Sequence, residues 1–365
     1  MNFFETSISK KAISNAVKAL KSGWISAGKC AEEFESRLER DLGLINPVTL
    51  NSGTSSLHLG LVVCGVGPGD EVIIPAQTFV ATGLVVLMQG AKPVFADIDP
   101  RTGNISPRSI EKKITKNSKA IIPVHWGGYP CDMDDIGAIA KRHNLAVIED
   151  AAQAVGASFK KKAIGALSRF TAFSFQAVKQ LTSGDGGALC CLYKRDAVLA
   201  KKLRWFGIDR VKAKPSLLGE RLYDISKTGY KYHLNDLQAA VGLGNLAGLR
   251  ARLERRRRVA MRYRNAFKRI SGIKPLDYKK DRESSYFLFT VLVEKRKDFI
   301  CSLLRRNIPA SVVHLRIDRN SVFGGVKPDL VGQEKFDCMQ VSLPIHEKLS
   351  DNDVSRVIKA VKSGW

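Results

Sequence analysis

The sequence predicts an α/β protein in which a largely parallel sheet is covered by helices on both faces and is followed by a smaller α+β unit. Through the first two-thirds of the 365 residues, short apolar runs alternate with helical patterns, which is typical of parallel sheets. Beyond a strongly basic stretch near residue 250, the order of elements changes. We therefore predict a large domain at residues 1–250 and a small domain at residues 251–365, without a Pro- or Gly-rich linker.

The strands of the large domain are predicted from apolar runs bounded by turn residues. The first run follows the turn Gly67-Pro68-Gly69-Asp70. The predicted strands cover residues 71–75, 93–98, 120–125, 145–150, 170–175 and 187–193. Helical patterns lie between several of them, for example at residues 55–63 and 133–143. Ligands of parallel sheets bind at the carboxyl ends of the strands, so polar residues just after these strands are the candidates for a site.

The small domain is predicted to begin within a long amphipathic helix at residues 246–270, where apolar residues recur at helical spacing. Predicted strands follow at residues 286–293, 310–315 and 339–344, and predicted helices at residues 298–306 and 351–362. Because the boundary lies inside a helix, we expect the small domain to pack rigidly on the large one.

The chain is strongly basic, with 59 basic and 35 acidic residues and a net charge of +24. Much of this charge lies at residues 250–269, which include four consecutive arginines, Arg255 to Arg258. Helical spacing places most of these arginines on the outer faces of the helix, which favours a solvated basic face or attraction of an anionic small substrate. A nucleic-acid-binding or regulatory homologue is the non-enzyme alternative, although no helix-turn-helix, zinc-finger or RNA-recognition signature accompanies the charge.

The sequence also favours a particular cellular location. No apolar run reaches the roughly 18 residues that span a bilayer, and the first residues lack the pattern of a secretory signal. The seven cysteines show no Cys-x-x-Cys spacing and lie mostly in apolar surroundings, so we expect buried reduced thiols. We expect a cytoplasmic protein with no membrane span and no metal site.

Two features suit the binding of a phosphorylated ring compound. Small and hydroxylated residues at 51–56 precede an apolar helix, and a helix N-terminus with free N–H groups and a glycine, Gly53, is typical of a phosphate site. The alternative is an ordinary N-cap. Phe79 follows the strand at residues 71–75, where its ring could stack on a planar ligand or belong to the core.

Two ionisable residues follow later strands. Asp150 ends the strand at residues 145–150, where its carboxylate could bind a metal, a ribose or a protonated ring nitrogen, or cap a helix. Lys179 lies between two apolar strands, ahead of the glycine-rich turn at residues 184–187. Desolvation lowers the pKa of a lysine and provides a neutral amine for a Schiff base, although a lysine near glycines also suits a surface loop.

Taken together, the four features match the requirements of pyridoxal phosphate. The phosphate anchors the cofactor, and the carboxylate keeps the pyridine nitrogen protonated so that the ring accepts electrons from a carbanion. The lysine holds the aldehyde as an imine and later moves protons.

With these residues in view, the sequence resembles the DegT-type (DegT/DnrJ) sugar aminotransferases within the fold type I pyridoxal phosphate enzymes. The resemblance covers nearly the whole chain and implies a mostly parallel seven-stranded sheet flanked by helices, with a small α+β domain at the C-terminus. It is carried by the strings Gly23-Trp24-Ile25-Ser26-Ala27-Gly28, Ser52-Gly53-Thr54, Gly69-Asp70-Glu71-Val72-Ile73, Thr78-Phe79-Val80-Ala81-Thr82, Glu149-Asp150-Ala151-Ala152-Gln153-Ala154, Ser174-Phe175 with Lys179, and Gly184-Asp185-Gly186-Gly187.

The resemblance implies roles by position. Lys179 would form the Schiff base and act as the acid and base, and Asp150 would pair with the pyridine nitrogen. Gln153 would lie beside the ring hydroxyl. Phe79 would stack on the ring, and Gly53, Thr54 and Ser174 would hold the phosphate. In the family a partner subunit completes the phosphate site from a Gly-Tyr-Asn segment, which implies a homodimer with the active site at the interface; here Lys231 stands at the Asn position.

The resemblance also implies a reaction, the transfer of an amino group from L-glutamate to a keto sugar carried on a nucleoside diphosphate. Dehydratases of the family carry histidine in place of Lys179, so aminotransfer is favoured. The product is an amino sugar for polysaccharides, glycans or glycosylated metabolites, with C4 favoured over C3. His314 and Arg316 resemble a region that faces the sugar nucleotide. A keto-cyclitol aminotransferase and a sugar dehydratase remain the alternatives within the family.

Overall fold

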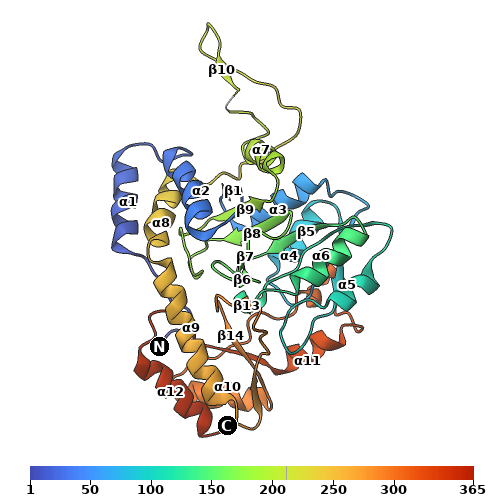
Figure 1. The fold of residues 1–365 in the computed structure, drawn as a ribbon, viewed down its shortest axis with the longest axis vertical. Helices are drawn as coiled ribbons and strands as arrows, with labels where there is room; N and C mark the ends of the chain where they lie inside the picture. Colours follow the sequence, from blue (N-terminus) through green and yellow to red (C-terminus); the bar gives the residue numbers. More distant parts are fainter. Residues whose placement is uncertain (211) are drawn as a thin grey trace.

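A seven-stranded, mostly parallel sheet forms the upper half of the computed structural model, which describes residues 1–210 and 212–365 (Figure 1). Its strand order is β1-β9-β8-β5-β4-β2-β3. β9 runs antiparallel to both of its neighbours, β1 and β8, and the other pairings of this sheet among the described residues are parallel. The strands are β1 (Pro47–Leu50), β2 (Glu71–Pro75), β3 (Lys92–Ala96), β4 (Ser118–Ile121), β5 (Ala146–Asp150), β8 (Phe170–Ser174) and β9 (Gly187–Cys191). The predicted fold class is confirmed.

Helices cover both faces of this sheet because neighbouring strand residues point to opposite faces. Val72 and Ile74 of β2 pack with helices on one face, whereas Ile73 packs on the other. The first face is covered by α3 (Gly53–Cys64), α4 (Ala81–Met88) and α7 (Lys194–Leu203). The second is covered by α2 (Lys29–Leu42), α5 (Pro107–Lys113), α6 (Met133–Arg142) and α8 (Asp236–Leu246), and α1 (Lys10–Lys21) packs outside α8. The strands are therefore buried on both sides, as their continuous apolar runs predict.

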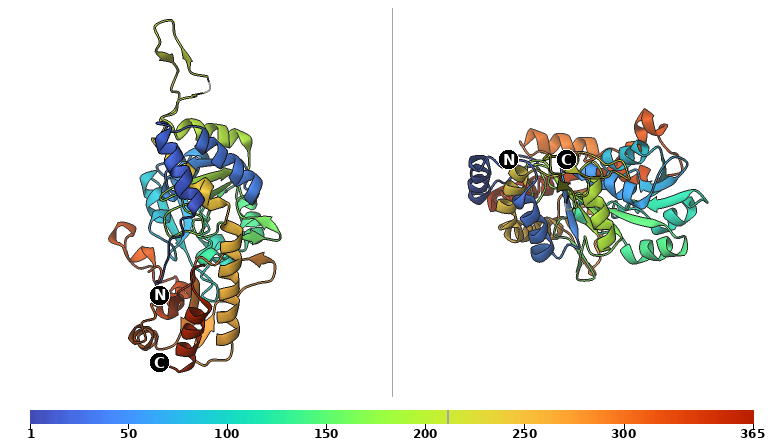
Figure 2. Two further views of the ribbon diagram at one scale, coloured as in Figure 1. Left: turned by 90° about the vertical axis from the view of Figure 1, so that its left-hand side faces the viewer. Right: turned by 90° about the horizontal axis from the view of Figure 1, so that it is seen from above.

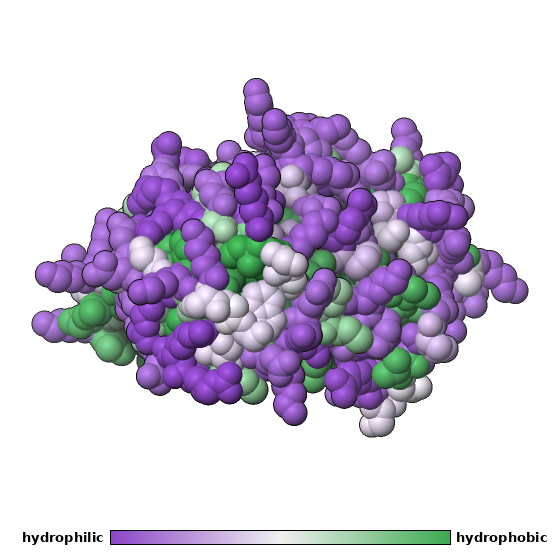
Figure 3. Space-filling view, turned by 90° about the horizontal axis from the view of Figure 1, so that it is seen from below, coloured by the Kyte–Doolittle hydropathy of each residue, from purple (hydrophilic) through white to green (hydrophobic). Residues whose placement is uncertain are grey.

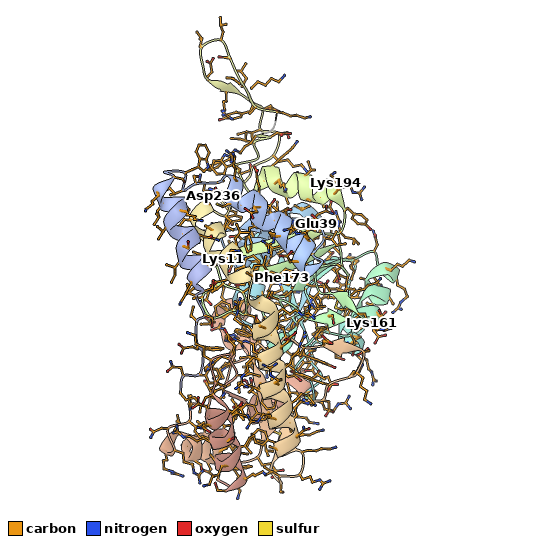
Figure 4. The ribbon with its side chains drawn as sticks, turned by 60° about the vertical axis from the view of Figure 1, so that its left-hand side comes forward. Lys11, Glu39, Lys161, Phe173, Lys194 and Asp236 are labelled. Atoms are coloured by element: carbon orange, nitrogen blue, oxygen red, sulfur yellow. The ribbon has the colours of Figure 1, made fainter. Side chains whose placement is uncertain are left out.

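The N-terminus of α2 is capped by a residue from a distant helix. Its N-cap, Gly28, has no side chain to accept the free N–H groups of the first turn. Asp236, labelled in Figure 4 at the start of α8, accepts hydrogen bonds from the backbone N–H groups of Gly28, Cys30 and Ala31 at 2.9–3.1 Å. This carboxylate fixes α2 against α8 beside the sheet.

The C-terminal part contains a second, antiparallel sheet at the lower end of the molecule, where both chain termini also lie (Figures 1 and 2). The strands β12 (Ile273–Pro275), β14 (Phe289–Val293) and β15 (Gln340–Leu343) pack against α9 (Leu249–Phe267), α10 (Arg296–Arg305) and α12 (Asp351–Lys362), and α11 (Val331–Met339) lies beside β14. Seen from below, hydrophilic side chains surround a central patch of apolar and intermediate ones (Figure 3).

Two predictions for this part are wrong. Residues 310–315 form no strand; they run as an extended segment with one bridge to the sheet, between Ser311 and Ser342. The apolar spacing across residues 246–270 belongs to two helices, because α8 ends at Leu246 and α9 begins at Leu249 after Gly248. The division into domains at residue 250 stays a prediction.

The arginine run of α9 is not a uniformly solvated face. Arg256 is 2% exposed, pairs with Glu347 at 3.0 Å and donates to the backbone carbonyls of Tyr286 and Ile345. Its neighbours Arg255 and Arg257 pair with Asp351 and Glu283. These pairs join α9 to the C-terminal part, whereas Arg250 and Arg258 are exposed, so only part of the basic run remains to support the nucleic-acid alternative.

Two smaller features complete the fold. The short strands β10 (Lys214–Pro215) and β11 (Arg221–Leu222) form a hairpin that projects from the upper end of the molecule (Figures 1 and 2). The strands β13 (Arg282–Glu283), β6 (Ser158–Phe159) and β7 (Lys162–Ala163) form a small third sheet. No helix within residues 1–210 and 212–365 is long and apolar enough to cross a membrane.

Candidate active site

A cavity of about 320 Å³ opens at the carboxyl ends of the parallel strands, the edge at which such sheets bind ligands. The ends of four strands and the segments that follow them supply most of its polar lining, and the C-terminal part contributes Phe287 and His314. These residues are Ser52, Gly53 and Thr54 after β1, Thr78, Phe79 and Thr82 after β2, Asp150 and Gln153 at the end of β5, and Ser174, Gln176 and Lys179 at the end of β8.

The start of α3 forms one end of this cavity. Ser52 is the N-cap, and its hydroxyl accepts a hydrogen bond from the backbone N–H of Ser55 at 3.0 Å. The first N–H groups of a helix have no partner within the helix, and they attract anions. A Cβ atom at Gly53 would lie 2.8 Å from Cβ of Ser174. Glycine therefore permits the close approach of the helix start to the end of β8, as a phosphate cradle requires.

Asp150 ends β5 with its carboxylate buried. Oδ2 accepts a hydrogen bond from the Thr82 hydroxyl at 2.7 Å, and Oδ1 accepts one from the backbone N–H of Ala152 at 3.1 Å. Burial raises the pKa of the Asp150 carboxyl above its ordinary value, while these two bonds and the charge of Lys179 oppose that rise. The net rise indicates a buried carboxylate whose charge the chain's own groups compensate only in part.

Lys179 lies in the loop after β8, and its Nζ stands 4.2 Å from the centroid of the Phe287 ring. Burial lowers the pKa of the Lys179 amine to about 8, and attraction to Asp150 opposes this shift. At pH 7 about a tenth of such an amine is neutral, far more than for an exposed lysine. Lys179 therefore has both a nucleophilic and a protonated form within the working range of pH.

Gln153 and Phe79 also face the cavity. Oε1 of Gln153 accepts a hydrogen bond from the backbone N–H of Gly127 at 2.7 Å, which fixes the orientation of its amide and leaves the NH2 group as its free end. The Phe79 side chain is 55% exposed, so it does not belong to the core, and its ring centroid lies 5.3 Å from that of His314.

The structure brings His314 to the cavity but does not bring two other predicted residues there. Burial and the charge of Lys179 lower the pKa of His314 to about 4, so its imidazole is neutral at pH 7. Arg316 is 2% exposed and forms a two-point ion pair with Asp318. Nζ of Lys231 lies 3.7 Å from the centroid of the Trp205 ring, outside the lining of this single chain.

Among the lining residues that sequence reasoning missed are Thr82, Phe287 and Phe4. Thr82 lies in a string that the resemblance included, but nothing in its local pattern indicated a bond to Asp150. Phe287 and Phe4 come from the C-terminal part and the N-terminus, and their rings stack at 5.4 Å. Only the tertiary fold brings these two rings to the cavity, so no local signal could have found them.

The seven-stranded sheet with its C-terminal α+β part and its cavity at the carboxyl edge define a member of the fold type I class of pyridoxal-phosphate-dependent enzymes. The chain belongs to the DegT/DnrJ/EryC1/StrS aminotransferase family, whose model matches residues 6–362. The predicted resemblance is thus confirmed, and the protein is a sugar aminotransferase by family.

Individual relatives match the chain over almost its whole length. The spore coat polysaccharide biosynthesis protein SpsC of Bacillus subtilis is 37% identical over 97% of this chain and 94% of its own length. The GDP-perosamine synthase of Caulobacter vibrioides is 34% identical over 94% of this chain and 93% of its own. The crystal structure of the sugar aminotransferase CalS13 from Micromonospora echinospora matches with a TM-score of 0.95 at 30% identity, covering 100% of both chains.

Proposed function

We propose that this enzyme uses pyridoxal phosphate to transfer an amino group from L-glutamate to a keto-deoxysugar carried on a nucleoside diphosphate, with C4 as the position aminated. The observation that carries the proposal is the placement of the buried Asp150 and the half-buried Lys179 in one cavity at the carboxyl edge of the sheet. Support for the substrate class comes from the relatives named for polysaccharide biosynthesis and for GDP-perosamine synthesis.

The residues present fit this cofactor. The raised pKa of Asp150 reflects a buried carboxylate that a protonated ring nitrogen would compensate. The space at Gly53, which a Cβ would fill, suits a phosphate at the start of α3. Lys179 would hold the cofactor through Nζ, Gln153 would lie beside its ring hydroxyl, and Phe79 would cover its ring.

When bound, pyridoxal phosphate supplies an electron sink that stabilises a carbanion at the carbon bearing the nitrogen. The residues of the chain transfer protons and orient the bound ligands. The neutral Nζ of Lys179 accepts a proton and later returns it from the same side of the cavity. A pKa of about 8 allows this amine to act both as a base and, once protonated, as an acid. The bonds from Thr82 and Ala152 hold the Asp150 carboxylate in one orientation, and the walls formed by Phe79 and Phe287 limit access of water.

We further propose that the working form is a homodimer. The lining of the cavity within one chain includes Lys179 as its one lysine or arginine among the described residues, whereas the proposed substrates carry several negative charges. Lys231 lies outside the cavity of its own chain. It would serve as a phosphate ligand for the cavity of a second copy.

The test is a reaction of the purified enzyme, loaded with pyridoxal phosphate, with L-glutamate and then with UDP-, dTDP- and GDP-linked 4-keto-6-deoxyhexoses. We expect L-glutamate to convert the visible absorbance of the cofactor to the shorter-wavelength amine form, and the keto sugar to restore it. Mass spectrometry should show exchange of the keto oxygen for an amino group. Loss of water instead would identify a dehydratase, and amination of a keto-cyclitol alone would identify the other alternative.

A further inference from the structure

The backbone carbonyl of His314 is held by two buried glutamine side chains. Nε2 of Gln77 and Nε2 of Gln340 each donate a hydrogen bond to this oxygen at 2.9 Å. A third glutamine, Gln333, donates from its Nε2 to Oε1 of Gln77 at 2.8 Å. All three side chains belong to residues with 0% exposure. We call Gln77, Gln333 and Gln340 the amide cluster.

The amide cluster joins segments that are far apart in the sequence. Gln77 lies just after β2, two residues before Phe79, whereas Gln333 lies on α11 and Gln340 begins β15. The backbone makes the same connection next to it, since the N–H of Ile317 donates to the carbonyl of Ala76 at 2.9 Å. The cluster therefore fixes the distance between two walls of the cavity, the loop that carries Phe79 and the segment that carries His314.

On either side of His314 the segment is held by other contacts, because Val313 packs in an apolar cluster and Arg316 pairs with Asp318 and Glu334. Residues 310–316 form no strand, and their one bridge to the sheet is made by Ser311. At His314 itself, the described residues form no other backbone hydrogen bond, so the two amide donors fix the position of its carbonyl and of the backbone from which the ring reaches Phe79.

Two oxygens of the amide cluster have no hydrogen-bond partner in the part of the chain that the structure describes. Oε1 of Gln333 and Oε1 of Gln340 are buried without a hydrogen-bond partner among the described residues. Unpartnered buried oxygens cost stability, and apolar side chains of similar volume would avoid that cost. What amides provide here, and apolar side chains do not, is a directional hold on one carbonyl oxygen.

We propose that Gln77, supported by Gln333 and Gln340, is a positioning residue that holds the imidazole of His314 against the sugar part of the acceptor. This inference rests on the proposed function for the identity of the acceptor. A neutral imidazole can donate one hydrogen bond and accept another, which suits a sugar hydroxyl. The cluster then acts in the half-reaction with the keto sugar and not in the half-reaction with L-glutamate.

The experiment compares Gln77→Met, which keeps the side-chain length and removes the amide, with Thr290→Val. Thr290 is a matched control because it lies on β14 beside Gln340's strand, is 4% exposed, and loses a buried hydrogen bond to Ser342 while forming no side-chain hydrogen bond to the cluster. In Gln77→Met we expect the KM for a GDP-linked 4-keto-6-deoxyhexose to rise at least tenfold. The rate of the L-glutamate half-reaction should stay within twofold, and Thr290→Val should match the wild type in both.

A second readout does not depend on turnover. The imidazole of His314 is followed by NMR titration in the same proteins, with its signals assigned by a His314→Gln variant. Release of the segment in Gln77→Met should raise the pKa of His314 from about 4 toward its ordinary value, with no change in Thr290→Val. If Gln77→Met does not fold, Gln340→Met removes one of the two donors and should give a smaller shift in the same direction.

An unchanged His314 titration in the folded variant, or an equal loss in both half-reactions, would overturn the inference. If the wild type fails to aminate any nucleotide-linked keto sugar, the proposed function fails instead. The titration still decides whether Gln77 positions His314.

Discussion

At the scale of single residues, burial shifts the pKa values of the two ionisable residues of the site in opposite directions. Burial lowers the pKa of Lys179 and raises the pKa of Asp150, and each charge partly relieves the other. In the chain alone, burial disfavours the charged form of both residues. A cofactor that brings a ring cation to Asp150 and a reactive carbonyl to Lys179 would satisfy both, so the cost of burying these groups prepares the site for its ligand.

The first prediction concerns the chemistry of Lys179. Replacement by alanine should abolish aminotransfer, and Lys179→Arg should be equally inactive, because a guanidinium keeps the charge but cannot supply a neutral amine. We expect product formation to fall about 10³-fold or more in both variants, measured by mass spectrometry of the amino sugar. Activity of Lys179→Arg within tenfold of the wild type would show that Lys179 acts only through its charge.

The second prediction concerns stability and pH in the cofactor-free protein. Folding lowers the pKa of Lys179 from 10.5 to about 8, so between these values the unfolded chain binds more protons and stability rises with pH. Below pH 8 the buried ammonium costs about 3 kcal/mol. Lys179→Met should therefore unfold at higher urea concentration than the wild type at pH 7, and the difference should shrink as the pH approaches 10.5. A difference that is constant from pH 7 to pH 10 would contradict this account.

At the scale of elements, the sequence predicts best where one pattern decides the structure. The helix at residues 351–362 coincides with α12, and the run at residues 71–75 with β2, since each has clear boundaries. The apolar run at residues 310–315 predicted a strand because periodicity reports apolar character and not a hydrogen-bonding partner. β1 was not predicted because four residues carry too short a pattern, and its place is set by pairing with β9.

The same reasoning explains what could be predicted of the site. Gly53, Asp150 and Lys179 each follow a strand or begin a helix, so the rule for parallel sheets is enough to place them together at one edge. The amide cluster and Phe287 depend on how the C-terminal part packs, which no local pattern encodes. Arg316 looked suited to a phosphate, but its guanidinium is held by Asp318 and Glu334.

The third prediction tests the start of α3 as an element. In Gly53→Ala the new Cβ would lie 2.8 Å from Cβ of Ser174, which closes the space above the helix N-terminus. We expect the affinity for pyridoxal phosphate to fall at least about tenfold. The affinity is measured by titrating the cofactor-free protein and following its absorbance.

Gly137→Ala is the control for this prediction, because Gly137 lies on α6 with nothing within 4 Å of its Cβ position. That substitution should leave cofactor affinity unchanged and stabilise the protein by up to about 1 kcal/mol. Equal cofactor affinity in the two variants would show that Gly53 is an ordinary helix start.

At the scale of the whole molecule, part of the positive charge of +24 lies in ion pairs that join α9 to the C-terminal part. α9 leaves the large sheet and packs on the C-terminal part, and its arginines reach acidic residues and carbonyls there. Two neighbouring arginines differ sharply in environment. Arg256 is 2% exposed, whereas the pair of Arg255 with Asp351 is open to solvent, with Asp351 72% exposed.

The last prediction uses this contrast. Arg256→Met removes a buried guanidinium and leaves Glu347 and two carbonyls without their partner, so we expect a loss of about 3 kcal/mol in the free energy of unfolding. Arg255→Met removes the same side chain one position away. It breaks an ion pair with the exposed Asp351 and one hydrogen bond to the Leu349 carbonyl, so its loss should be smaller, about 1 kcal/mol. Both values come from urea unfolding at one ionic strength, and added salt should reduce the Arg255 effect more than the Arg256 effect. Equal small losses in the two variants would restore the interpretation of the arginine run as a solvated basic face. A large loss confined to Arg256→Met would show that the buried arginine of this run holds the C-terminal part against α9.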